Sequence, residues 1–402
     1  MGNCYSDSGV PDTVFENEGP LTEELRRKMN SFNFNTDIKI RTNDDIFKDY
    51  TIIKQLGSGL FSKVYLVTDK VEEKIAMKVI KKKDFQTTET IQKMIIEKEV
   101  LKLLNHQNVL KLYRTVQSES RIFFFVEFAS KGNLLQLLNL KGRLDFNETR
   151  NVAAQIYDAL YYIHSKGIIY GDLKAENVLI ARSGQLKLCD FNLSGTQSIL
   201  SDTLQGTICY LAPEIVEGKK RTHMSDYWAF GVLVHLLFYR KYPFRCNNQT
   251  DLFYNIINRN IDPEPSDIRA PSSLRRFIED LLTKDVTKRL GRNRDAVMNH
   301  PFFTGFDWKN YQRNPATFRY AAEAEDSDCR SSSASSQPNS DVEDFAKMQL
   351  TPTDRVVYNI EGFTYDSVRK DFGAQSEPRR KIKKQETNDS KNYQLSNPSS
   401  HF

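Results

Sequence analysis

Three polar side chains lie in one short segment that is apolar at both ends. In the stretch IIYGDLKAENVLI, residues 168–180, Asp172 is followed two positions later by Lys174 and five positions later by Asn177. The apolar residues on both sides predict short buried strands, so the residues between them form a loop. A carboxylate can accept a hydroxyl proton, an ammonium group can neutralise phosphate charge, and a carboxamide oxygen can bind Mg²⁺. By itself this spacing is a modest signal, because a surface turn can contain the same residue types by chance.

Further segments supply groups of the same kind. Asp190 follows the apolar run LKLC and adds a second carboxylate. Gly57 and Gly59, in YTIIKQLGSGLFSKVYLV at residues 50–67, let backbone amides approach phosphate oxygens because neither carries a Cβ atom. Hairpin turns use glycines at the same spacing, so this feature alone is a weak indication. Lys78, in the strand-like run IAMKVI, then adds a positive charge.

Together these segments resemble the catalytic loop, the metal-binding loop, the Gly-rich loop and the lysine strand of eukaryotic protein kinases. The resemblance covers residues 50–368. It implies an α+β, bilobal protein-kinase fold with a small β-rich N-lobe, a mainly helical C-lobe and a C-terminal tail. The third glycine of the family pattern is Ser62 here, which should stiffen the tip of the Gly-rich loop.

The resemblance implies ATP and Mg²⁺ as cofactors and gives each polar residue a role. Asp172 is expected to accept the hydroxyl proton, and Lys174 to stabilise the transferred phosphoryl group. Asn177 and Asp190 are expected to bind the metal. The resemblance implies that backbone groups near Glu127 and Ala129 form hydrogen bonds to adenine. The family places eleven residues around the nucleotide: Leu56, Gly57, Ser58, Gly59, Val64, Ala76, Lys78, Glu127, Ala129, Leu179 and Asp190.

Lys78 is expected to bind the α and β phosphates while an ion pair holds it in place. Apolar residues recur at helical spacing between residues 89 and 104, and this segment resembles the regulatory helix of the family. The register indicates Glu97 as the partner of Lys78, since Glu99, two residues away, cannot share that face. The alternative is that both glutamates are solvated helix charges.

The segment TLQGTICYLAPE, residues 203–214, resembles the T-x-x-G-T-x-x-Y-x-A-P-E pattern of the AGC group of kinases. This group includes protein kinases B and C and the serum- and glucocorticoid-regulated kinases. The resemblance implies an ATP-dependent protein serine/threonine kinase, with Thr203 as a phospho-acceptor and Thr207 in contact with the catalytic loop. The later segments LTPTD and EGFTY resemble AGC tail motifs, with Thr351 and Thr364 as acceptors. Regulation by phosphorylation of the activation loop and the tail is therefore expected.

Three positions depart from the family pattern. Gly171 stands where most kinases carry an arginine that binds the activation-loop phosphate, and Gly195 replaces a second basic residue. Of the usual phosphate partners only Lys93 remains, so a phosphate on Thr203 is expected to order this loop less than in relatives. Asn192 replaces a glycine, and asparagine is expected to serve there because it tolerates positive φ.

These departures leave a catalytically weak or inactive pseudokinase scaffold as the alternative. Every group expected to touch nucleotide, metal or the transferred phosphoryl is present, which favours an active enzyme. Substrate choice also looks altered, because Asn133 and Leu236 replace acidic residues that hold substrate arginines in basophilic AGC kinases, while Glu176 remains. We therefore expect the enzyme to select only weakly for substrates with paired arginines upstream of the acceptor. Glu214 of the APE motif is expected to pair with Arg289.

Composition is compatible with this interpretation. The chain has 402 residues, 39% of them hydrophobic, and a net charge of +5, which gives no indication of nucleic-acid binding. Five scattered cysteines without a C-x-x-C pair indicate reduced thiols. No apolar run reaches the roughly 18 residues of a membrane span, and no signal-peptide pattern opens the chain. We therefore expect a cytoplasmic protein.

Changes of composition divide the chain into four regions. Residues 1–49 form an N-terminal extension and residues 50–303 the catalytic domain. Residues 304–375 form an AGC-type tail, and residues 376–402 a basic and polar tail expected to be disordered. The expected partners are protein substrates and an upstream activating kinase, and nucleic acid is not among them.

The N-terminus MGNCYSDS fits the pattern for myristoylation of Gly2. Cys4 lies close enough to supply a second, palmitoyl anchor, which stable membrane binding requires. The alternative is a short disordered tail that happens to begin with Met-Gly. Acylation would place the protein at the inner leaflet of a membrane.

Overall fold

The computed structural model describes residues 20–30, 34–35, 48–59, 62–84, 88–197, 199–200, 205–246, 248–262, 264–265, 267–311, 359–360 and 363–367. The chain divides into two compact units, Met1–Asp366 and Ser367–Phe402, and every described residue except Ser367 belongs to the first. No helix in these ranges is long and apolar enough to cross a membrane.

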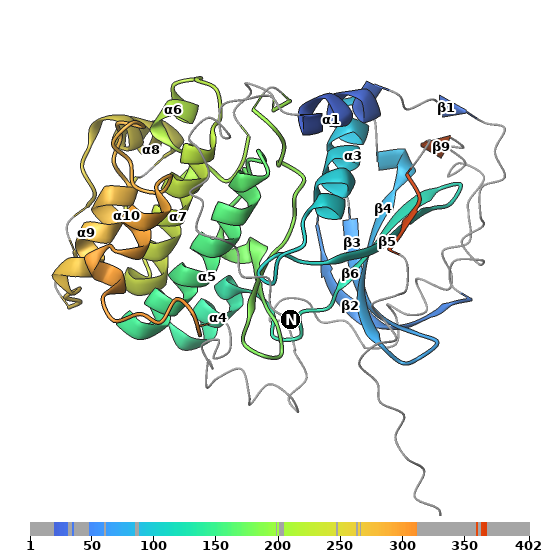
Figure 1. The fold of residues 1–402 in the computed structure, drawn as a ribbon, viewed down its shortest axis with the longest axis horizontal. Coiled ribbons are helices and arrows are strands. Elements are labelled where there is room, and N and C mark those ends of the chain that lie inside the picture. The colour runs from blue at the N-terminus through green and yellow to red at the C-terminus, as the bar shows by residue number, and fades with distance from the viewer. Residues whose placement is uncertain are drawn as a thin grey trace, which may run out of the picture. The chain divides into compact units, whose positions relative to one another are not determined.

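An antiparallel sheet of six strands forms the first part of the fold (Figure 1), in the order β10-β5-β6-β4-β3-β2. The inner strand β6 has the sequence RIFFFVE, and its three phenylalanines are 0% exposed because both of its faces are covered. The strands are β2 (Tyr50–Ser58), β3 (Ser62–Asp69), β4 (Lys74–Lys81), β5 (Leu112–Gln117), β6 (Arg121–Glu127) and β10 (Tyr365–Asp366).

The helix α3 (Thr88–Leu103) packs against this sheet. Its buried residues Ile91 and Met94 belong to the same apolar cluster as Ile80 of β4 and Phe124 of β6. Residues 94–101 of α3 are all buried, so the helix is covered by other segments, α1 among them, as well as by the sheet. This packing fixes the position of Glu97, which lies on the same helix.

Helices make up the second part of the fold. α5 (Phe146–Ser165) begins at a capping box, in which Asp145 and Glu148 each accept a hydrogen bond from the other's backbone amide. α7 (His223–Tyr239) is apolar on all sides and almost wholly buried, as a central helix requires. The remaining helices are α4 (Leu134–Lys141), α6 (Pro213–Val216), α8 (Gln249–Asn258), α9 (Ser272–Leu281) and α10 (Arg294–Met298), with short turns η2 (Lys82–Asp84), η4 (Ile208–Tyr210) and η5 (Pro301–Phe303). A β-sheet lobe followed by a helical lobe confirms the predicted fold class.

A small hairpin positions both loops that the sequence singled out. β7 (Val178–Ile180) pairs with β8 (Leu186–Leu188), and the turn η3 (Ala175–Asn177) leads directly into β7. The backbone N–H of Cys189 donates to Asn177 O at 3.0 Å. The loop before the hairpin and the loop after it are thereby held side by side.

Segments from both ends of the described chain lie on the sheet lobe. The N-terminal extension contains a helix, α1 (Pro20–Asn30), which packs on α3. Strand β1 (Phe34–Asn35) pairs with β9 (Asn359–Ile360), and β10 pairs with β5. Residues 20–30 of the N-terminal extension and residues 359–360 and 363–366 of the C-terminal tail are therefore part of this lobe.

Candidate active site

Lys78 of β4 forms the ion pair that the register of α3 predicts. Its Nζ lies 2.7 Å from Glu97 Oε1 and 3.5 Å from Asp190 Oδ1. Burial by itself would lower the pKa of Lys78, but the negative charges of Glu97 and Asp190 outweigh burial and raise it, so the ammonium group stays charged. The side chains of Lys78 and Asp190 are 20% and 35% exposed. A solvent-accessible cation of this kind can bind an anionic ligand.

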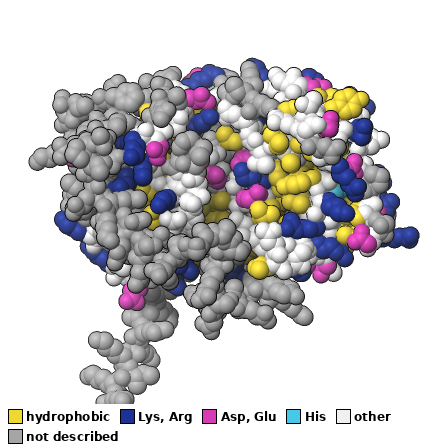
Figure 2. Space-filling view, turned by 180° about the vertical axis from the view of Figure 1, so that it is seen from behind, with side chains coloured by type: hydrophobic (Ala, Val, Ile, Leu, Met, Phe, Trp, Pro, Cys, Tyr) yellow, Lys and Arg dark blue, Asp and Glu magenta, His cyan; other side chains and the backbone are white. Residues whose placement is uncertain are grey.

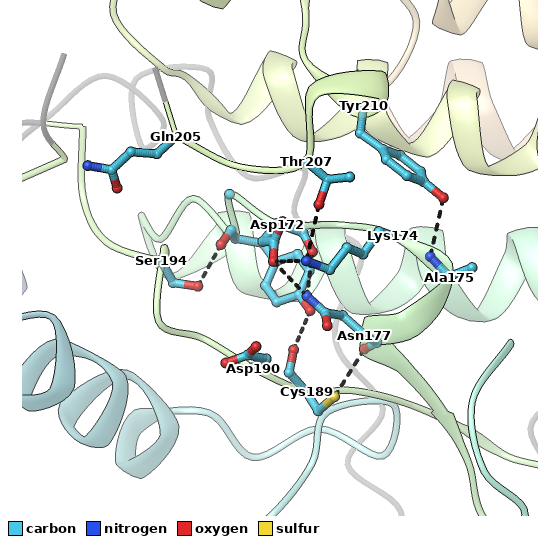
Figure 3. A network of polar contacts seen from close by, with 12 residues as sticks. Asp172, Lys174, Ala175, Asn177, Cys189, Asp190, Ser194, Gln205, Thr207 and Tyr210 are labelled. Atoms are coloured by element: carbon cyan, nitrogen blue, oxygen red, sulfur yellow. Dashed lines mark hydrogen bonds and ion pairs between the residues drawn. The ribbon is translucent and has the colours of Figure 1, made fainter. Parts of the chain in front are cut away.

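The catalytic loop brings its three predicted side chains together (Figure 3). Lys174 Nζ lies 2.7 Å from Asp172 Oδ2 and donates to Thr207 Oγ1 at 3.1 Å. Asn177 Nδ2 donates to Asp172 Oδ2 and to the main-chain oxygen of the same residue, each at 2.9 Å. Two donors thus hold one oxygen of a carboxylate that is only 7% exposed. The other oxygen, Oδ1, accepts no hydrogen bond within the described residues and is available to a substrate hydroxyl.

Asp226, in the first turn of α7, fixes the backbone just before this loop. Its Oδ2 accepts a hydrogen bond from Tyr170 N, and its Oδ1 accepts one from Gly171 N, both at 2.8 Å. His164 Nε2 lies 2.8 Å from the same Oδ2. The segment 168–180 gives no signal of this role, because the contacts join residues more than fifty positions apart.

Asn177 and Asp190 are the residues expected to bind Mg²⁺, and their geometry fits a hard cation. Asn177 uses its Nδ2 on Asp172, which leaves its side-chain oxygen for a metal. Oxygen ligands from one or two side chains suit Mg²⁺, which completes its shell with phosphate oxygens and water. No group of three or more His, Cys, Asp or Glu side chains that could hold a metal occurs among the described residues.

The expectation about Asn192 is wrong. The sequence interpretation gives position 192 a positive φ, but the non-glycine residues with positive φ in the described chain are Glu72, Asp190 and Arg240. Asp190 itself takes the left-handed conformation, with φ of 59°. The left-handed conformation therefore lies at Asp190, and Asn192 does not need to tolerate positive φ.

The phosphate side of the expected nucleotide site is the end of β2. Leu56, Gly57, Ser58 and Gly59 are all exposed. The N–H of Gly59 donates to Ser62 O at 2.7 Å, which closes the turn toward β3. These residues are accessible to a ligand, and they lie on the hairpin that the sequence predicted.

The residues expected around adenine include Val64 of β3, Ala76 of β4 and Leu179 of β7. Val64 and Leu179 are half-buried and pack against the cluster that contains buried Ala76. Glu127 ends β6, and Ala129 follows it, both half-buried. These five residues come from both lobes, so a flat apolar ligand between them would contact each lobe.

Of the predicted modification sites, Thr364 lies within the described residues and the others do not. The Thr364 side chain is exposed. Its neighbour Phe363 is 1% exposed and packs edge-on against Phe124, with ring centroids 5.6 Å apart. Thr115 Oγ1 donates to Phe363 O at 2.6 Å. Thr203, Thr351, Gly2 and Cys4 lie outside the described residues.

Arg221 is a residue near the site that sequence reasoning missed. It lies between α6 and α7, where its Nη1 donates to Gly171 O at 2.8 Å and its Nη2 donates to Gln205 O at 2.6 Å. Lys93, the expected phosphate partner, lies 2.9 Å from Glu89. Arg221 follows Lys219 and Lys220, so the sequence shows a basic run after the APE motif but does not single out the residue that reaches Gly171.

Two further contacts shape the activation segment. The expected pair of Glu214 and Arg289 is confirmed, with N–O distances of 2.7 and 2.8 Å. Ile208 and Tyr242 are exposed, and Tyr242 packs edge-on against Tyr210 at 5.7 Å. The backbone N–H of Ala175 donates to the Tyr210 hydroxyl at 3.4 Å, so these exposed apolar side chains lie near the catalytic loop. Figure 2 shows acidic, basic and hydrophobic side chains together near the middle of the molecule seen from behind.

Comparison with known proteins gives consistent matches. Residues 50–303 match the family model described as Protein kinase domain. The chain is 32% identical over 300 residues to the putative 3-phosphoinositide-dependent protein kinase 2 of Homo sapiens, covering 70% of this chain and 74% of that protein. It is 33% identical over 268 residues to the serine/threonine-protein kinase Sgk1-B of Xenopus laevis, covering 65% and 61%. It is 34% identical over 288 residues to the atypical protein kinase C of Drosophila melanogaster, covering 67% and 47%. The chain spans about half the length of several such relatives.

Proposed function

The chain belongs to the protein kinase family, within the AGC group, and from this premise we propose that it transfers the γ-phosphoryl group of ATP to serine or threonine hydroxyl groups of proteins. The observation that carries the proposal is the arrangement around Asp172. Its carboxylate is held at one oxygen by Lys174 and Asn177 and keeps the other oxygen available. The ion pair of Lys78 and Glu97 is formed in the same structure.

Each residue of the site contributes a separate part of the reaction. Asp172 Oδ1 accepts the proton of the attacking hydroxyl, and Lys174, held by Thr207, stabilises negative charge on the moving phosphoryl group. Lys78 orients the α and β phosphates, and its ion pair with Glu97 holds the ammonium group in position. Asn177 and Asp190 are the residues that would hold Mg²⁺, which would supply positive charge to neutralise the phosphates.

Serine or threonine is the favoured acceptor. Lys174, two residues after the base, is the arrangement of serine/threonine kinases, and it lies directly on the carboxylate at 2.7 Å. The exposed apolar side chains of Ile208 and Tyr242 next to the loop suit a peptide segment rather than a small polar molecule. A protein substrate follows from both observations.

A pseudokinase scaffold is the second candidate. Gly171 motivated it, yet the structure provides another contact to the activation segment through Arg221. The proposal has two further parts. An upstream kinase phosphorylates Thr203, Thr351 and Thr364. Acylation at Gly2 and Cys4 brings this cytoplasmic protein to a membrane surface. Mass spectrometry of the native protein, which reports these modifications together, tests them, and their absence would contradict them.

The first test replaces the proposed base. Asp172→Asn keeps the size of the side chain and removes its ability to accept a proton. We expect the rate of phosphoryl transfer to a protein substrate to fall by about 10²–10⁴-fold. Binding of ATP should change little, because Asp172 does not contact the nucleotide phosphates in the proposed arrangement. A metal-dependent assay with labelled ATP measures the first quantity, and fluorescence titration with an ATP analogue measures the second.

A matched control is Asp158→Asn, which changes a carboxylate that pairs with His106 away from the site. Its transfer rate should remain near that of the wild type. Equal rates in the wild type and Asp172→Asn, or no transfer by the wild type with any protein substrate, would support the scaffold instead.

A further inference from the structure

The residue before the proposed base has no side chain that could reach the activation segment. Gly171 has φ of +86°, a conformation that L-residues rarely adopt. A Cβ atom added there would lie 2.4 Å from the backbone oxygen of Leu193. The arginine that most kinases carry at this place therefore does not fit without a shift of the neighbouring loop.

Arg221 reaches the same region from another part of the chain. Its guanidinium bridges the catalytic loop, at Gly171 O, and the activation segment, at Gln205 O, with distances of 2.8 and 2.6 Å. A planar guanidinium with several fixed donors holds two acceptors in one geometry. The two backbone segments are thus joined by a single side chain.

The contacts of this guanidinium do not require a phosphate group. Both of its acceptors, Gly171 O and Gln205 O, are backbone oxygens. Burial lowers the pKa of Arg221, and the charges of Asp226, Asp172 and Glu214 oppose that effect only in part. Arginine stays protonated under such conditions.

Gln205 is held from a second direction as well. Its side chain hydrogen-bonds to Glu89 of α3, and Glu89 lies 2.9 Å from Lys93. The activation segment is therefore linked to the regulatory helix through neutral and acidic groups. Both links to Gln205 are present without any modification of the chain.

These links lie close to the reacting groups. Gln205 is followed two residues later by Thr207, which accepts a hydrogen bond from Lys174 at 3.1 Å. Gly171 is the residue directly before Asp172. A change at Arg221 can therefore displace both the base and the lysine beside it, although Arg221 itself touches neither substrate nor nucleotide.

We propose that Arg221 is a positioning residue that clamps the activation segment to the catalytic loop and replaces the arginine missing at position 171. Residues 205–210 are then in their working position before Thr203 is modified. The proposal rests on the proposed kinase activity and specifies how that activity is regulated.

The test compares Arg221→Met, Arg221→Lys and Thr203→Ala in the full chain. Arg221→Met keeps the apolar stem and removes both donors, and we expect kcat to fall by about tenfold or more while KM for ATP stays within about twofold. Arg221→Lys keeps the charge and one donor, and kcat should recover to within about threefold of the wild type. Thr203→Ala should change kcat by less than about twofold.

A second measurement does not depend on catalysis. Amide hydrogen exchange over residues 205–210 in the nucleotide-free protein should be faster in Arg221→Met than in the wild type, and intermediate in Arg221→Lys. Should Arg221→Met fail to fold, Arg221→Lys decides: faster exchange supports the clamp, and unchanged exchange overturns it. Full kcat in Arg221→Met, or a loss in Thr203→Ala as large as that in Arg221→Met, also overturns it. A wild type without transfer activity but with this exchange difference contradicts the proposed function and supports the clamp.

Discussion

At the scale of single residues, the positions that bind substrate arginines in basophilic relatives have other tasks here. Asn133 is the N-cap of α4, and its Oδ1 accepts a hydrogen bond from Gln136 N at 2.9 Å. Leu236 is 3% exposed in the last turn of α7. Only Glu176, which is half-buried, keeps a carboxylate. The charge that would select paired arginines is therefore missing from two of the three positions.

The matching prediction concerns substrate selection. Asparagine and aspartate are equally good N-caps, so Asn133→Asp should keep α4 intact and add one negative charge. We expect preference for arginine upstream of the acceptor to rise by roughly two- to fivefold, as for an exposed ion pair. An oriented peptide library measures the preference.

Asn133→Ser serves as the control, because serine also caps a helix and adds no charge. Its arginine preference should equal that of the wild type. Strong arginine selection at both upstream positions in the wild type would contradict the interpretation of Asn133 and Leu236.

At the scale of elements, α1 is attached to α3 by a buried carboxylate. Glu99 is 4% exposed and lies 2.7 Å from Lys28 of α1, 2.7 Å from Lys98 and 3.2 Å from Lys102. Burial would raise the pKa of Glu99, but hydrogen bonds and charges from these lysines outweigh it and lower the pKa to about 2. Leu25 of α1, 2% exposed, adds apolar contact. The helix that carries Glu97 is thus tied to the N-terminal extension.

This attachment should depend on pH. A carboxyl group whose pKa is lower in the folded state stabilises that state above its unfolded pKa, and the stabilisation is lost as pH falls from about 4.5 toward 2. At neutral pH the contribution is about 3 kcal/mol at most. We expect Glu99→Gln to lower the midpoint of thermal unfolding at pH 7, and the difference from the wild type to shrink at pH 3.5.

Glu24→Gln is the matched control, because Glu24 also contacts Lys28, at 2.6 Å, but is exposed. Its effect should be small at every pH. A difference between wild type and Glu99→Gln that stays constant from pH 7 to pH 3.5 would contradict the role given to the Glu99 carboxylate.

At the scale of the whole first unit, the sheet lobe is completed by segments from both ends of its sequence. Ile360 and Phe363 are 2% and 1% exposed, and they belong to the large apolar cluster that also contains α3 and β6 residues. Gln117 holds Ile360 through both of its backbone groups, at 2.7 and 3.0 Å. The tail therefore contributes to the core on which the position of Glu97 depends.

Removing one of these side chains should weaken the lobe measurably. Phe363→Ala leaves a cavity next to Phe124 and Lys98, and such truncations cost about 3–5 kcal/mol. We expect the thermal midpoint of the unphosphorylated protein to fall by roughly 5–15 °C. Differential scanning calorimetry measures the change.

Thr364→Ala is the control, since this neighbouring side chain is exposed and its loss should shift the midpoint by little. An unchanged midpoint in Phe363→Ala would show that the tail does not contribute to the stability of the lobe.

Much of the site followed from the sequence because its groups are close along the chain or lie on regular elements. Asp172, Lys174 and Asn177 lie within six consecutive residues, so a single loop determines their relation. Glu97 was identified from the register of residues 89–104 against the kinase family. The fold class followed from the resemblance of several motifs, in family order, to the same family.

Tertiary structure decided what depends on residues far apart. The sequence indicated that Asn192 needed positive φ, whereas packing of the loop places that conformation at Asp190. The sequence revealed that the usual arginine is absent at position 171, but it did not reveal which residue replaces it. Arg221 meets Gly171 only after α6 and α7 have packed. Local spacing fixes which groups are available. Contacts across fifty residues depend on how the elements pack, and no local pattern encodes them.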